Sequence, residues 1–136
     1  MTHPALPLQK AIIDTLKANE AVNAIVQGRV YDHVPTKPVF PYIVLANEAF
    51  TRALWQHECF VDLQWFTKST GRPAVKRLGE AVIDALEGYL EIEGFDTDEW
   101  GLEDVTYFQE DNNETQMGEA SFRYLVSAGE SLFEDQ

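Results

Sequence analysis

The chain has 136 residues, which suits one domain, and 45% of them are hydrophobic, enough to fill a core. Its formal net charge of −13 is concentrated in residues 87–136, which carry 15 acidic residues and one basic residue, Arg123. Such an acidic surface disfavours binding to nucleic acid or to an anionic membrane. The single cysteine, Cys59, excludes an intrachain disulfide and a cysteine-rich zinc site.

The N-terminal residues lack the pattern of a secretory signal, and no apolar run approaches the ~20 residues of a membrane span. We therefore expect synthesis in the cytoplasm and no membrane contact. A first helix is predicted from Leu8, Ile12 and Leu16, which recur every four residues. A second short helical turn begins at Asn19 and ends at Gly28 in a left-handed conformation.

Three strands are predicted after Gly28. A short strand comes first, followed by a stiff loop containing Pro35, Pro38 and Pro41. Residues 42–50 and 57–67 form two longer strands, and residues 51–56 connect them. The second of these has the clearest alternation, with apolar side chains at Cys59, Val61, Leu63 and Trp65.

A second long helix and three further strands are predicted from the rest of the chain. Ser69 and Thr70 are candidate caps for a helix with an early Pro73 that extends to Leu86. The segments that follow are a short strand, an acidic turn region, two long strands and an acidic tail: residues 89–93, 94–101, 102–110, 117–128 and 129–136. Residues 111–116 form the hairpin tip between the long strands.

The predicted order is thus helix, three strands, helix, three strands. This order predicts an α+β fold with two helices packed on a mainly antiparallel sheet and a long, projecting C-terminal hairpin. Residues 1–136 form a single domain in this prediction, because the chain contains no linker, repeat or low-complexity tract.

The sequence contains no catalytic pattern. His57 and Cys59 share one face of a strand, but same-face neighbours lie about 7 Å apart, beyond hydrogen-bond reach. Cys59 lies on the apolar face, where a free cysteine behaves as a small hydrophobe. Asp96, Asp98 and Glu99 lack the spacing of a calcium loop. We therefore expect no enzymatic activity, no cofactor and no metal.

Apolar side chains in connections and in the tail are candidates for contacts with other subunits. Trp55, Trp100, Leu132 and Phe133 are of this kind, and each tryptophan is either a flap over its own core or an anchor for a neighbour.

The hairpin tip is a second candidate. It carries Glu110, Asp111 and Glu114 with no base nearby in the sequence. These carboxylates either line a lumen, touch a neighbouring ring or belong to an ordinary surface turn.

The order of motifs resembles the tail completion proteins of bacteriophages and gene transfer agents, also called tail terminator or tail-to-head joining proteins. The resemblance rests on Gly28 to Asp32 (Gly-Arg-Val-Tyr-Asp), Val34-Pro35 and the strand entry Phe40-Pro41-Tyr42. It continues with the alternating strand from His57 to Trp65 and the glycine-led helix from Gly71 to Leu86. Together these motifs span nearly the whole chain.

The resemblance implies a structural subunit of a ring, usually hexameric, in the neck of the virion. Such a ring ends the tail tube and joins it to the head connector, and DNA passes through its lumen. The implied partners are the chain itself, the tail tube protein and the head–tail connector. An acidic wall would avoid trapping the passing DNA, although acidity also serves plain solubility. The alternative is an acidic DNA mimic or inhibitor that binds a basic nuclease or repressor.

Overall fold

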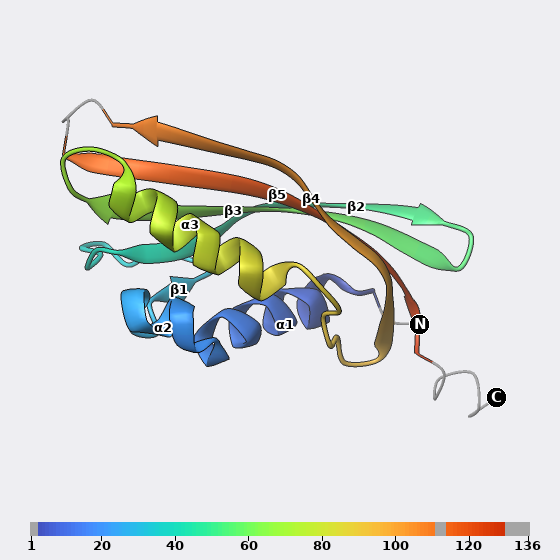
Figure 1. The fold of residues 1–136 in the computed structure, drawn as a ribbon. Coiled ribbons are helices and arrows are strands. Elements are labelled where there is room, and N and C mark those ends of the chain that lie inside the picture. The colour runs from blue at the N-terminus through green and yellow to red at the C-terminus, as the bar shows by residue number, and fades with distance from the viewer. Residues whose placement is uncertain (1–2, 111–113, 130–136) are drawn as a thin grey trace.

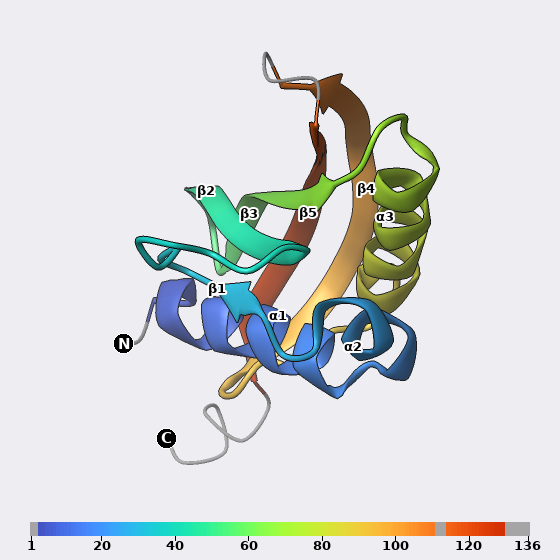
Figure 2. The ribbon, with the colours of Figure 1, turned by 90° about the vertical axis from the view of Figure 1, so that its left-hand side faces the viewer.

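Three helices lie on one side of a five-stranded sheet in the computed structural model, which describes residues 3–110 and 114–129 (Figures 1 and 2). In chain order the elements are α1 (Ala5–Ala18), α2 (Glu20–Val26), β1 (Val30–Tyr31), β2 (Tyr42–Ala53), β3 (Gln56–Lys68), α3 (Pro73–Leu86), β4 (Phe95–Gln109) and β5 (Thr115–Ala128). The α+β class is confirmed, and so is the long C-terminal hairpin, which consists of β4 and β5.

The strand order in the sheet is β1-β2-β3-β5-β4. Only β1 and β2 are parallel, and the other neighbouring pairs are antiparallel. The central pair joins β3 to β5 without interruption, from Gln56 opposite Ser127 to Lys68 opposite Thr115. β4 forms one edge, and its pairing with β5 is interrupted by bulges at Asp98 and Glu103.

The N-terminal helices end as their sequences predict. Asn19 separates them and caps α2, because its side chain accepts a hydrogen bond of 3.0 Å from the backbone N–H of Val22. Left-handed conformations at Gln27 (φ 51°) and Gly28 (φ 80°) end α2 and turn the chain into β1. The short helical turn predicted here is therefore a separate helix, α2, in addition to the two predicted long helices.

The core lies between the sheet and the three helices. Alternate residues of β3 and β5 point toward the helices, and α3 buries Val75, Leu78, Val82 and Leu86 against them. The Trp65 Nε1–H donates to the carbonyl of Val75 at 3.0 Å, and the Tyr124 hydroxyl donates to the carbonyl of Leu86 at 3.0 Å. Two buried aromatic residues thus hold both ends of α3 on the sheet.

Several predicted boundaries are wrong. Residues 89–93 form no strand apart from a single bridge between Ile92 and Phe95. Of the predicted acidic turn at 94–101, residues 95–101 belong to β4, whose charged side chains are solvated because they lie on an edge strand. The connection between β2 and β3 shrinks to the two residues Leu54 and Trp55. Neither Ser69 nor Thr70 caps α3, since Arg72 occupies the N-cap without a side-chain bond.

Candidate functional site

The outward face of the sheet is covered by none of the helices (Figure 1). Its central side chains bond to one another across the strands. Gln64 donates to Glu119 at 2.9 Å, and the Ser121 hydroxyl donates to Asp62 at 2.6 Å. Arg123 donates to Glu58 at 2.6 Å and to Glu99 at 3.4 Å. Many carboxylates of this face therefore have partners within the subunit.

One end of the outward face is aromatic. The Tyr42 ring stacks on Phe66 at 5.0 Å and meets Phe40 edge-on at 5.2 Å. Lys68 lies over the Phe40 ring at 5.1 Å, and Phe108 on β4 is 42% exposed. Sequence analysis missed this cluster, because recognising it needs the register of neighbouring strands.

The β2–β3 hairpin carries Trp55 at its tip, beyond the helices (Figure 1). Leu54 is 80% exposed and Trp55 is 65% exposed. Leu54 also adopts a left-handed conformation (φ 55°), which is unfavourable for a branched apolar residue. Exposed apolar groups at the end of a projecting hairpin are suited to contact another molecule.

Trp100 lies on β4 and faces the helix side of the sheet. Its ring packs against Tyr89 edge-on, with centroids 6.1 Å apart and planes at 90°. Trp100 is nevertheless 43% exposed and Tyr89 is 55% exposed. Trp100 was interpreted either as a flap over its own core or as an anchor for a neighbour. Neither interpretation applies alone, because the ring packs against its own subunit and still leaves part of its surface exposed. Sequence analysis missed Tyr89, which had been placed in a strand.

Only some of the remaining predicted contact residues belong to the part of the chain that the structure describes. Leu132, Phe133 and Asp111 lie outside the described residues. Glu110 and Glu114 are exposed. The N–H of Glu110 donates to the carbonyl of Thr115 at 2.8 Å, and Ser69 donates to the carbonyl of Glu114 at 2.7 Å. Glu114 therefore lies beside the loop that precedes α3.

His57 and Cys59 do not form a catalytic pair. Burial and the nearby carboxylates Glu48 and Glu58 raise the pKa of the Cys59 thiol to about 12, far from that of a nucleophile. The Cys59 Sγ lies 3.7 Å from the backbone carbonyl of His57 and makes no bond to its ring. The His57 ring instead packs against His3 and Phe95, at 5.1 and 6.4 Å. This cluster closes the core under the N-terminus.

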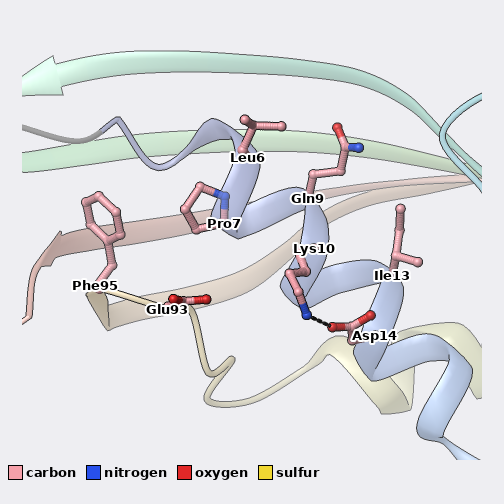
Figure 3. A pocket seen from close by; sticks show the side chains of 9 residues that line it. Leu6, Pro7, Gln9, Lys10, Ile13, Asp14, Glu93 and Phe95 are labelled. Carbon is pink, nitrogen blue, oxygen red and sulfur yellow. Dashed lines mark hydrogen bonds and ion pairs between the residues drawn. The ribbon is translucent and has the colours of Figure 1, made fainter.

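A groove of about 660 Å³ lies between α1 and the turn before β4 (Figure 3). Leu6, Ile13 and Phe95 line it, and Lys10 forms an ion pair with Asp14 at its edge. The two charged side chains are 69% and 58% exposed, so water screens them. The groove has the character of a surface depression and not of a reaction site.

Two further observations bear on chemistry. Within residues 3–110 and 114–129, no group of three or more His, Cys, Asp or Glu side chains is arranged to hold a metal ion. In the same part of the chain, no helix combines the length and the apolar character needed to cross a membrane.

Comparisons with known proteins agree with this architecture. Among solved structures, a chain of the "Virion of native gene transfer agent (GTA) particle" has the same fold, with a TM-score of 0.83 and 22% sequence identity. The match covers 94% of this chain and 100% of that chain. Curated proteins give no match. The family model described as tail completion protein gp17 matches residues 10–127, from α1 to β5. The chain therefore belongs to the family of tail completion protein gp17 and is a structural protein of the bacteriophage tail.

Proposed function

We propose that this chain is a subunit of a hexameric ring that ends the phage tail tube and joins it to the head connector. DNA passes through the lumen of the ring. The observation that carries the proposal is the family match over residues 10–127. The likeness to a chain of a gene transfer agent virion supports the fold on which the proposal rests.

The exposed apolar groups support assembly with other virion proteins. Large apolar side chains are exposed at the tip of the β2–β3 hairpin (Leu54 and Trp55) and on β4 (Trp100). Such exposed apolar groups are suited to contacts with other proteins. Leu132 and Phe133 add apolar groups in the tail of the chain. In the proposed ring these residues contact neighbouring subunits, the tube protein or the connector.

The acidic balance supports a passage for DNA. Glu110, Asp111 and Glu114 at the β4–β5 tip are proposed to line the lumen or to touch a neighbouring ring. A negative wall lowers the affinity for the phosphate backbone, so DNA slides past without being held. No enzymatic step is assigned to the ring, because Cys59 and His57 lack the geometry and the pKa of a catalytic pair.

A gene deletion in the phage tests this function. We expect lysates without the protein to contain filled heads and separate tails, and the wild-type gene supplied in trans to restore joined, infectious particles. Electron microscopy of purified particles should then place the protein between tube and connector, in six copies. Joined particles in its absence would overturn the proposal. Recovery of the protein outside particles, bound to a basic nuclease or repressor, would favour the DNA mimic instead.

A further inference from the structure

The charges of α3 run against the polarity of the helix. Arg72 occupies the N-cap, Lys76 and Arg77 follow, and the first turn has no acidic residue. The second half and the C-cap carry the carboxylates Glu80, Asp84 and Glu87, and the last turn has no basic residue. A helix N-terminus is itself electropositive and a C-terminus electronegative, so both sets of charges destabilise the isolated helix. An arrangement that breaks a local rule in this way suggests a use outside the subunit.

The cations at the start of α3 have no ion-pair partner in the part of the chain that the structure describes. Arg72 and Arg77 are exposed, and Lys76 lies over the Tyr107 ring at 5.8 Å. Glu114 is at the same end of the molecule, where its carbonyl accepts from Ser69. Arg123 differs from these cations, because it forms ion pairs with two carboxylates on the outward face.

A surface of complementary chemistry lies just past the other end of α3. The exposed rings of Tyr89 and Trp100 meet edge-on there, 6.1 Å apart. Two exposed carboxylates, Glu87 and Glu91, lie two residues before and two residues after Tyr89 in the chain. Aromatic faces and carboxylates are the two groups that a guanidinium binds best, by cation–π contact and by charged hydrogen bonds. We call this the aromatic–acidic surface.

We propose that the occupant of the aromatic–acidic surface is the basic start of α3, Arg72 and Arg77, from a second copy of this chain. Within one subunit the two surfaces cannot meet, because the 14 residues of α3 separate them by about 21 Å. Each copy carries one of each, so the contact is heterologous. A heterologous contact repeats from copy to copy and closes into a ring when the rotation allows. The inference rests on the proposed ring and specifies its subunit contact.

Charge reversal tests the contact without endangering the fold. One variant combines Arg72→Glu with Arg77→Glu, a second combines Glu87→Lys with Glu91→Lys, and a third carries all four changes. The changes in α3 place acids at its start and a base at its end, so each of the first two variants should unfold at or above the wild-type temperature. The matched control reverses two exposed cations elsewhere, Lys17→Glu and Lys37→Glu.

Sedimentation of the full-length chain at low salt gives the readout. We expect the wild type and the control to form larger species that dissociate as salt rises, each two-site variant to remain monomeric, and the four-site variant to regain association. Wild-type association in either two-site variant, or a monomeric wild type, would overturn this contact. The proposed ring is tested separately, by the gene deletion and the electron microscopy of particles described above. Binding of duplex DNA that is lost only with Arg72 and Arg77 would also overturn the contact, since it would assign these cations to phosphate.

Discussion

The Trp65 indole fills the space that Gly118 leaves on the neighbouring strand. An added Cβ at Gly118 would lie 2.3 Å from both Cε2 and Nε1 of this ring, which is completely buried and bonded to Val75. Gly79 on α3 leaves room for the ring in the same way, since an added Cβ there would lie 2.8 Å from Trp65 Cζ2 and 2.2 Å from the Tyr107 hydroxyl. The position of α3 on the sheet thus depends on two glycines that face one indole.

Gly118→Ala is therefore expected to destabilise the fold by about 1–3 kcal/mol, the usual cost of overpacking a core. The indole must move, and its hydrogen bond to Val75 is strained. The free energy of unfolding in urea measures the effect. Gly101→Ala on the edge strand is the matched control, because a Cβ there meets nothing within 4 Å. Equal stability of the two variants would contradict this account of the core.

Cys59 is expected to be inert in the folded protein. With its pKa raised to about 12, almost no thiolate exists at pH 8, and the side chain is buried. A thiol reagent should label the protein in urea and leave the native protein unlabelled. Cys59→Ser should cost about 1–3 kcal/mol if the hydroxyl stays unpaired, with no loss of any turnover. Rapid stoichiometric labelling of the native protein would show that this strand opens readily.

His57 should make stability depend on pH. Burial first, and then the nearby His3 and Arg52, lower its pKa below the ordinary value of 6.5. The unfolded chain thus binds a proton at a higher pH than the folded one does. The stabilisation is complete above about pH 6.5 and is lost as the pH falls through the folded pKa. Unfolding measured from pH 7.5 to 5.5 should show this decline, and His57→Gln should flatten it. An identical slope in both proteins would refute the assignment.

Trp55 should matter for assembly and not for folding. Trp55→Ser removes a ring that is 65% exposed at a hairpin tip, so the isolated subunit should unfold within about 0.5 kcal/mol of the wild type. Complementation of the gene deletion should fail or yield few joined particles. Trp65→Ser, which removes a buried ring, should do the reverse and prevent folding in the first place. Full infectivity with Trp55→Ser would remove the hairpin tip from the proposed interfaces.

The acidic tip of the β4–β5 hairpin can be tested by combining Glu110→Lys, Asp111→Lys and Glu114→Lys. Glu110 and Glu114 are exposed, and exposed charges contribute little to stability, so the subunit should fold normally. Particles should lose infectivity, either because heads and tails fail to join or because DNA is held by an attractive wall. The neutral set Glu110→Gln, Asp111→Asn and Glu114→Gln separates these causes, since it removes the negative charge without adding attraction. Normal yields of infectious particles from the lysine variant would leave the tip without a role.

Strands with alternating buried and exposed residues were predicted correctly from the sequence. The prediction failed at the start of β4, where charged residues replace the alternation. β3 was evident because every second residue from Cys59 to Trp65 is apolar. The start of β4 was mistaken for a turn because its acidic side chains are solvated on an edge and its alternation is broken at Asp98 and Glu103. Such a strand is held by its pairing with β5, and that pairing is invisible in a local window.

The candidate contacts were predictable only in part. Trp55 was identified from its position between two strands, because a large ring in a short connection has little core to join. Tyr89 and Trp100 meet through the packing of a loop against an edge strand, so no spacing in the sequence announces the pair. The reversed charges of α3 are visible in the sequence, yet their meaning depends on where the helix begins and ends.

The central position of β3 has a consequence for synthesis. Its two neighbours are β2, which precedes it, and β5, which is the last strand to leave the ribosome. Until β5 arrives, one edge of β3 and much of the apolar surface under α3 have no cover. A nascent or prematurely ended chain therefore exposes an unpaired strand edge and apolar surface to chaperones and proteases. Only a chain translated through β5 can become a building block, so protein quality control in the host acts as a filter before any particle is built.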